Sequence, residues 1–191
     1  MCLVIKCLFD FFISSIILLF LFPFFIIVAV LIKLDSKGPI FYLQNRVGKS
    51  GHLFKVYKFR TMTNKRRDPN VKQTFLDDPD ITRIGGLLRR FKIDELPQIW
   101  NVFVGDMSLV GPRPALPSLY EKYGDLANKR CSVRPGMTGW AQVNGNIYLS
   151  WEERLRLDSE YVDHVSFMLD LKIIIKTVAI VLFGEEKYIK K

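Results

Sequence analysis

The sequence predicts a mostly helical protein of the α/β type, with a small β-hairpin, that is attached to a membrane through its N-terminal segment. An apolar run of 22 residues without a charge occupies Phe11–Ile32. Two short strand-like stretches follow it, and beyond residue 80 the apolar residues recur mostly at helical spacing. We therefore expect a membrane segment at residues 1–34 and one membrane-associated domain at residues 35–191.

The apolar run is long enough to cross a bilayer. As a helix it would measure about 33 Å, against a hydrocarbon core of about 30 Å. It is too long for the apolar part of a signal peptide, and no small-residue cleavage site follows it. Lys33 and Lys37 place the following domain in the cytoplasm by the positive-inside tendency. Pro23 leaves two outcomes open, a kinked helix that crosses and a broken helix that returns, and hydropathy alone favours crossing.

Positive charge is concentrated directly after the membrane segment. The chain has a formal net charge of +9, and residues 37–67 contain nine Lys or Arg and no Asp or Glu. A basic block beside a membrane favours anionic lipids or phosphorylated ligands over nucleic acid. The three cysteines, Cys2, Cys7 and Cys131, lack paired spacing, which argues against a metal cluster and fits a reducing compartment.

The two strands are expected at Pro39–Gln44 and Leu53–Met62, joined by a glycine-bearing turn. In the second strand Lys58 and Arg60 alternate with Phe59, so both cations share one face and the ring lies on the other. That face either binds phosphate or is simply solvated.

The remaining chain alternates polar loops with helices. We expect loops at Asn64–Pro79 and Val133–Gly145, and helices at Ile81–Phe91, Leu96–Phe103, Leu116–Tyr123, Ser150–Asp163 and Phe167–Leu182. Ser150 and Glu153 form a capping box for the fourth helix. The last helix carries Lys172 and Lys176 on one side and apolar residues on another. It either lies in the membrane interface or packs on the core.

The stretch Arg89–Pro114 contains the strongest chemical signal. Asp94 and Glu95 stand between a basic run and Pro97. Asp94 is a natural N-cap, with the proline in the first turn of the following helix. Nearby cations should keep an Asp ionised. An ionised Asp is a nucleophile that can accept a phosphoryl group, and a simple helix cap is the structural alternative.

Taken together, these motifs resemble the bacterial sugar transferase family, the monotopic polyprenyl-phosphate phosphoglycosyl transferases, in its minimal form. The resemblance covers nearly the whole chain. It rests on five motifs in a fixed order, namely KFRTM at 58–62, DELPQ at 94–98, GDMS at 105–108, GPRP at 111–114 and RPGMTGWAQVNG at 134–145.

The resemblance implies a two-step reaction with catalytic residues Asp94 and Glu95. Asp94 would attack the β-phosphate of a UDP-sugar and release UMP, and a polyprenyl phosphate such as undecaprenyl phosphate would then accept the phosphosugar. This would be the first membrane step of polysaccharide, O-antigen or glycoprotein synthesis. Mg²⁺ is the implied cofactor, with Asp94 or Glu95 as its protein ligand. The implied substrate-binding residues are basic, namely Lys58, Arg60, Arg89, Arg113 and Arg134.

The resemblance also implies a re-entrant membrane helix broken at Pro23, which reverses the preference from hydropathy. The domain would then lie on the cytoplasmic face of the bacterial inner membrane. Three positions depart from the family pattern. Phe22 stands where a Ser often precedes the proline, the basic pair that begins the segment is reduced to Lys6-Cys7, and Asn146 replaces a frequent Arg.

Two rival functions stay open at this point. A non-enzymatic anchor protein would use the basic block for anionic lipid or a partner, and it would not need the Asp94-Glu95 pair. A hydrolase would pass the phosphoryl group to water. The sequence leaves open the sugar, the polyprenol length and whether the chain forms a homodimer.

Overall fold

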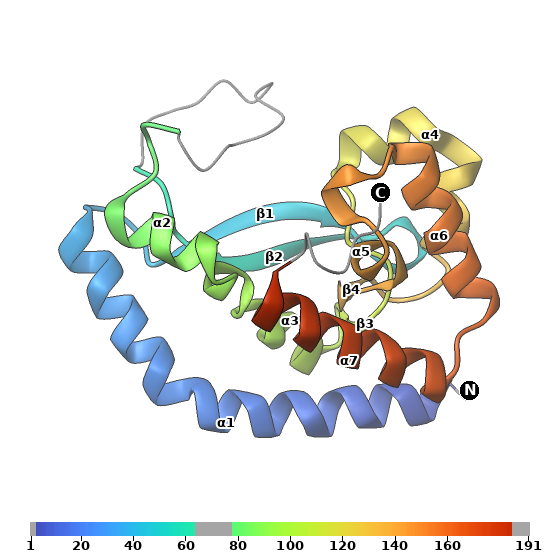
Figure 1. Cartoon of the computed structure of the whole chain (residues 1–191), viewed down its shortest axis with the longest axis horizontal. Coiled ribbons are helices and arrows are strands. Elements are labelled where there is room, and N and C mark those ends of the chain that lie inside the picture. Colours follow the sequence, from blue (N-terminus) through green and yellow to red (C-terminus); the bar gives the residue numbers. More distant parts are fainter. Residues whose placement is uncertain (1–2, 64–77, 185–191) are drawn as a thin grey trace.

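The computed structural model describes residues 3–63 and 78–184 of the chain. Most of these residues are helical, and the strands form two small sheets (Figure 1). The mostly helical fold with a small hairpin is therefore confirmed. Cys2 and nearly all of the predicted loop at Asn64–Pro79 lie outside the described residues.

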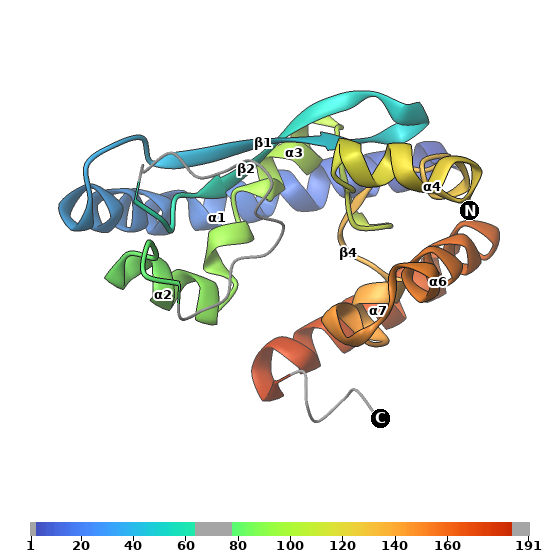
Figure 2. The same ribbon diagram turned by 90° about the horizontal axis from the view of Figure 1, so that it is seen from above.

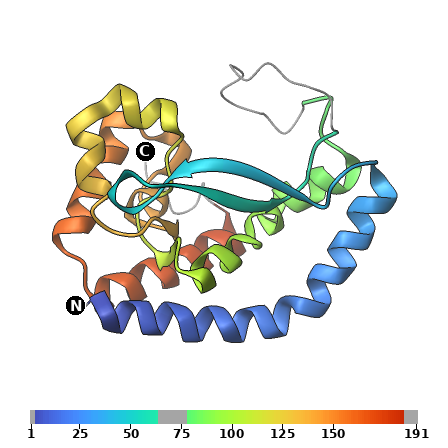
Figure 3. The same ribbon diagram turned by 180° about the vertical axis from the view of Figure 1, so that it is seen from behind.

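The N-terminal apolar segment forms one long helix, α1, from Leu3 to Asp35. Within the described residues it is the one helix long and apolar enough to cross a membrane. The helix is continuous through Pro23 and bends in its middle part, with the rest of the chain on the inside of the bend (Figures 1 and 3). A proline removes one backbone donor and crowds the preceding turn, which accounts for a bend there.

The first sheet is an antiparallel hairpin that lies above α1 in Figure 1. Strand β1 spans Phe41–Val47 and β2 spans Leu53–Phe59, with the one-turn helix η1 at Lys49–Gly51 between them. The predicted hairpin is confirmed. The first strand extends three residues beyond the predicted end at Gln44, because its polar residues still pair with the second strand.

Helix α2 at Arg83–Arg90 and helix α3 at Gln98–Val104 confirm the two predicted helices, the first with shorter bounds and the second beginning two residues later and ending one residue later. A one-turn helix, η2, at Ile93–Glu95 separates them. The prediction that Asp94 caps α3 is wrong, since Pro97 occupies that position. The chain turns at Lys92, whose φ of 57° is left-handed, and Asp94 falls inside the resulting single turn.

A second, parallel sheet was missed by the prediction of a loop at Val133–Gly145. Strand β3 at Ser108–Val110 pairs with β4 at Gly136–Thr138, and the short helix α5 follows at Trp140–Val143. Three-residue strands are too short to show a period, and their pairing is non-local. Gly136 is required here, because a Cβ on it would lie 2.0 Å from the Gly111 nitrogen. The glycines of this region therefore serve close contact between two backbone segments.

Three helices complete the fold: α4 at Pro117–Arg130, α6 at Trp151–Asp163 and α7 at Phe167–Phe183, with the one-turn helix η3 at Asn146–Tyr148 before α6. The predicted capping box of Ser150 and Glu153 is confirmed. Helix α7 buries Asp170 and Ile173 against the core and exposes an apolar face. The core-packed alternative is thus confirmed for one face. Seen from above, α7 diverges from α1 toward its C-terminal end (Figure 2).

The apolar core of the described residues consists of three clusters, and the first two include or contact residues of α1. The clusters are Val28, Ile32, Phe59 and Leu88, then Val56, Ile99, Val102 and Met107, and finally Val110, Val143, Tyr161 and Ile173. Most other apolar side chains of α1 are exposed, including Leu19, Phe20 and Leu34 at 74–80%. Because water would disfavour so large an apolar surface, α1 requires an apolar environment on its outer side.

The N-terminal end of α1 is attached to the domain by buried polar contacts. Lys6 forms an ion pair with Asp170 of α7, whose other carboxylate oxygen accepts a hydrogen bond of 2.7 Å from the Tyr161 hydroxyl. Asp10 accepts a hydrogen bond of 3.2 Å from the backbone N–H of Leu109. A charged group this poorly exposed is favourable only when it is paired, so these contacts define the position of the helix end.

The C-terminal end of α1 is attached to the same domain. Asp35 accepts a hydrogen bond of 3.0 Å from the backbone N–H of Ile84, in the first turn of α2. The guanidinium of Arg60 donates to the carbonyl oxygen of Ile32 at 3.3 Å and to both oxygens of Ser36 at 2.7 and 2.9 Å. Both ends of the apolar helix therefore meet one folded domain.

Candidate functional site

Glu95 is the centre of a charged cluster between β2, η2 and the Gly111–Pro114 segment. Its Oε1 lies 2.7 Å from Lys58 Nζ and 2.6 Å from Arg113 Nη2, and Arg113 Nη1 donates to Oε2 at 3.3 Å. Burial by itself would raise the pKa of Glu95, but the charges of Arg113 and Lys58 outweigh it and hold that pKa well below its usual range. Glu95 is thus a paired, ionised carboxylate.

Asp94 differs from its neighbour. Among the residues that the structure describes, no side chain or backbone group forms a hydrogen bond or ion pair with its carboxylate. Burial, and then the negative charge of Glu95, raise the pKa of Asp94, while Lys58, Arg89 and Lys92 act in the opposite direction. The three cations act to lower this pKa, and burial in the fold outweighs them.

The position of the dyad depends on the end of α2. Lys92 adopts the left-handed conformation, which costs a non-glycine residue about 1–2 kcal/mol and is common at functional sites. Arg89 Nε donates to Thr61 Oγ1 at 2.8 Å, which directs this arginine toward the hairpin side of the dyad. Helix α2 approaches that closely only because Gly85 faces Thr61, where a Cβ would lie 2.1 Å from the Thr61 carbonyl oxygen.

The backbone of Arg113 is fixed by a contact with Arg130. The Arg130 guanidinium donates to the Arg113 carbonyl oxygen and pairs with Asp158 of α6 at 2.8 Å. Burial raises the pKa of Asp158 to about 6 even though Arg130 and Arg154 favour its ionised form. This chain of contacts fixes the segment that presents Arg113 to Glu95.

The structure brings together four of the predicted functional residues besides Asp94, namely Lys58, Arg89, Glu95 and Arg113. It separates two others. Arg60 is buried and holds the end of α1, although sequence alternation placed it on the same face as Lys58. Arg134 lies beside Gly105 and lines a cavity near the N-terminal end of α1, together with Lys6, Asp10 and Tyr161.

Two arginines near Arg113 were missed by the sequence analysis. Burial lowers the pKa of Arg46 to about 10, with Arg113 as the next cause, while Glu95 acts in the opposite direction. Arg154 packs over the Trp151 ring at 4.9 Å, and its pKa is lowered by burial and then by Arg113. Neither arginine belongs to a motif with a chemical spacing, so only the fold reveals them.

Asn146, which departs from the family pattern, has a φ of 46° at the start of η3. Asn adopts this left-handed conformation at lower cost than most residues. The backbone therefore accounts for an Asn at this position.

The residues around the dyad suit one particular kind of metal site. The described residues contain no group of three or more His, Cys, Asp or Glu that could hold a metal ion. Mg²⁺ is commonly bound by one or two carboxylates together with substrate phosphates and water. The Asp94 carboxylate, which has no hydrogen-bond or ion-pair partner in the described part of the chain, fits that mode, whereas the oxygens of Glu95 are already paired.

Comparison with known proteins matches the chain to one family and to several similar relatives. The model of the family described as bacterial sugar transferase matches residues 1–184. The chain is 48% identical to the uncharacterized sugar transferase EpsL of Bacillus subtilis, over 84% of this chain and 78% of the relative. It is 45% identical to the exopolysaccharide production protein PSS of Rhizobium leguminosarum bv. phaseoli, over 92% and 94%. It is 40% identical to the UDP-glucose:undecaprenyl-phosphate glucose-1-phosphate transferase of Escherichia coli, over 88% of this chain and 38% of that protein.

Proposed function

The chain belongs to the bacterial sugar transferase family, and on that premise we propose that it transfers a sugar phosphate from a UDP-sugar to a polyprenyl phosphate at the cytoplasmic face of a membrane. The name of the Escherichia coli relative specifies a UDP-sugar and undecaprenyl phosphate. The name of the Rhizobium relative specifies exopolysaccharide production. The first name supports this reaction class for the chain, and the second supports a role in polysaccharide synthesis.

The observation that carries the proposal is the difference between the two adjacent carboxylates. Glu95 is paired with Lys58 and Arg113, whereas Asp94 has no partner among the described residues. Neighbouring acids in different environments commonly divide two roles. We assign Asp94 as the nucleophile and Glu95 as the residue that holds two cations beside it.

The first step forms a bond between an Asp94 carboxylate oxygen and the β-phosphorus of the UDP-sugar. The bond from that phosphorus to the bridging oxygen breaks, and UMP leaves with the electron pair. In the second step an oxygen of the polyprenyl phosphate attacks the same phosphorus and the bond to Asp94 breaks. The products are a polyprenyl-diphosphate-linked sugar and the free carboxylate.

The surrounding cations supply the charge that such a transfer requires. Phosphoryl transfer depends on positioning and on dispersed positive charge around the phosphate oxygens. Arg113 can present a fork to phosphate, and Lys58 and Arg89 lie on the other sides of the dyad. Mg²⁺ bound at Asp94 would neutralise further negative charge of the diphosphate.

The attachment of both ends of α1 supports a re-entrant helix. Lys6 and Asp10 bind the domain at one end, and Asp35 binds it at the other. A crossing helix would have one of these ends on the far side of the membrane, away from the domain. We propose that α1 enters and leaves on the cytoplasmic side, with the bend near Pro23 at its deepest point.

The nucleophile is tested by Asp94→Asn. We expect this variant to fold normally and to release no UMP, because an amide cannot form the phosphoryl bond. Incubation of the native enzyme with a UDP-sugar alone should add one phosphosugar to the peptide that contains Asp94, as measured by mass spectrometry. Turnover of the Asn variant at the native rate would refute the assignment. Release of free sugar phosphate without polyprenyl phosphate would instead indicate a hydrolase.

The topology is tested with Cys7, which is partly exposed, whereas Cys131 is buried. A membrane-impermeant thiol reagent should label Cys7 only after cells are opened. Pro23→Ala should favour a straight helix and increase labelling from outside. External labelling of the native protein would show that the helix crosses the membrane.

A further inference from the structure

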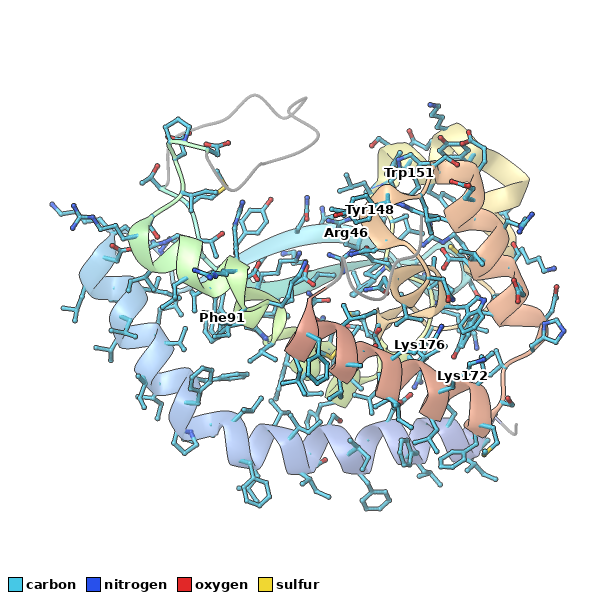
Figure 4. The ribbon with its side chains drawn as sticks, viewed as in Figure 1. Arg46, Phe91, Tyr148, Trp151, Lys172 and Lys176 are labelled. Atoms are coloured by element: carbon cyan, nitrogen blue, oxygen red, sulfur yellow. The ribbon has the colours of Figure 1, made fainter. Side chains whose placement is uncertain are left out.

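Two lysines of α7 lie over a single tryptophan ring. Lys172 Nζ and Lys176 Nζ are each 5.3 Å from the centroid of Trp140, the first residue of α5. Lys176 also donates a hydrogen bond of 3.0 Å to Asn144 Oδ1, which fixes its position. Figure 4 shows both lysines on α7, close to the short helices that precede α6. The two ammonium groups are thus held together by contacts with the α5 region.

Within residues 3–63 and 78–184, this pair of positive charges has no compensating acid. Lysines four residues apart on a helix repel each other, and no carboxylate among the described residues lies within ion-pair distance of either ammonium. Burial, and then the charge of Lys172, lower the pKa of Lys176. The Trp140 ring offsets part of the repulsion through cation–π contacts. An anion between the two lysines would offset the rest.

The position of the pair on α7 indicates where that anion comes from. The exposed apolar side chains of the helix are Phe167, Met168, Leu171, Ile175, Val178, Val181, Leu182 and Phe183. At 100° per residue, Lys172 and Lys176 border the stripe that runs through Met168, Leu171 and Ile175. When such a face enters a membrane, bordering lysines lie at the level of the lipid headgroups.

We propose that Lys172, Lys176 and Trp140 form a binding site for the phosphate group of a membrane lipid. The phosphate would lie between the two ammonium groups, and its acyl or polyprenyl chains would follow the apolar face of α7 into the membrane. The contacts described for these residues include none with the Asp94-Glu95 dyad. The inference rests on the proposed membrane location of the protein and is independent of the transfer reaction.

The test compares full-length variants with matched charge. Lys172→Gln/Lys176→Gln removes the site, and Lys172→Arg/Lys176→Arg preserves its charge. Lys122→Gln/Lys129→Gln removes two positive charges from α4, where Lys129 pairs with Asp163 on the surface. Each protein is placed in phosphatidylcholine nanodiscs that contain either polyprenyl phosphate or phosphatidylglycerol. Native mass spectrometry then measures the lipid that stays bound.

We expect the double Gln variant to retain about tenfold less bound lipid than the native protein, since each cation near a lipid surface contributes substantially to binding. The double Arg variant and the α4 control should retain as much bound lipid as the native protein. Loss with either lipid supports the site, and the lipid affected identifies the natural ligand class. Equal retention of both lipids by the Gln variant would overturn the proposal. Labelling of the Asp94 peptide by a UDP-sugar alone should persist in every variant, so failure of the proposed reaction would be seen separately.

Discussion

Two charged clusters of this protein are built alike but differ in whether every carboxylate has a hydrogen-bond or ion-pair partner. The first joins Lys6, Asp170 and Tyr161, where each carboxylate oxygen of Asp170 has a partner. The second joins Glu95 to Lys58 and Arg113, and beside it Asp94 has no partner among the described residues. Both combine residues that are distant in the chain. We call a carboxylate closed when both of its oxygens have a partner and open when neither has one. The first cluster is therefore closed, and the second contains the closed carboxylate of Glu95 beside the open carboxylate of Asp94.

The difference shows how a structural role and a chemical role can be separated. A buried carboxylate whose oxygens are all engaged stabilises an arrangement but cannot easily attack a substrate. An accessible carboxylate beside fixed cations can attack, since its oxygens are free and the cations are already in position. In this chain the fully paired carboxylates hold α1 and the cations in position, and in the proposed mechanism Asp94 stays available for the reaction.

The largest effect on stability is expected from removing the charge of Asp170. Asp170→Asn removes the charge that pairs with the poorly exposed Lys6, and leaving such a charge without a partner typically costs about 3 kcal/mol of unfolding free energy. The melting temperature in detergent should fall by about 6–12 °C for a chain of this size. Labelling of the Asp94 peptide should persist below the transition.

The control for this change is Asp163→Asn, which breaks the exposed pair with Lys129. Exposed pairs contribute about 0–1 kcal/mol, so the melting temperature should hardly change. Equal effects of the two substitutions would contradict the view that the Asp170 cluster is a buried attachment point.

A smaller effect on stability is expected at the dyad. Glu95→Gln leaves Lys58 and Arg113 without their shared carboxylate, which should cost about 2 kcal/mol of unfolding free energy, because these groups are partly exposed. Transfer activity should fall strongly while some adduct at Asp94 still forms. Glu121→Gln on α4 is the matched surface control. If the folded Glu95→Gln variant formed no adduct at all, Glu95 would have to be assigned as the nucleophile instead of Asp94.

The smallest effect concerns pH. Burial and the Glu95 charge raise the pKa of Asp94, so kcat/KM should decline with acid along a slope of one, at a pH above the ordinary Asp value of 3.8. Glu95→Gln removes the second cause and should move this decline to lower pH. A decline that stays in place after the substitution would show that Glu95 does not influence Asp94.

The stability of the native protein should also decrease with acid, because of Glu95. Its folded pKa is depressed below the ordinary value of 4.5. Its contribution to stability is therefore present above the unfolded pKa and is lost as the pH falls through the folded pKa. Acid unfolding of the native and Glu95→Gln proteins measures this contribution directly.

Local sequence alone determined the long apolar helix, the hairpin, most later helices and the Ser150–Glu153 capping box, because each depends on composition or on residues within a few positions. The motif order also pointed to Asp94 and Glu95. The sequence did not determine the parallel pair of β3 and β4, since strands of three residues have no readable period.

Only the tertiary structure decided which charges meet. Lys58 and Glu95 are 37 positions apart, and Lys6 and Asp170 are 164 positions apart. Arg60 shares a strand face with Lys58 in the sequence pattern, yet the strand ends at Phe59 and Arg60 holds the end of α1. The same folding buries Asp94 enough to raise its pKa against three nearby cations. Desolvation and long-range pairing depend on distances that the fold creates, so they cannot be inferred from neighbouring residues.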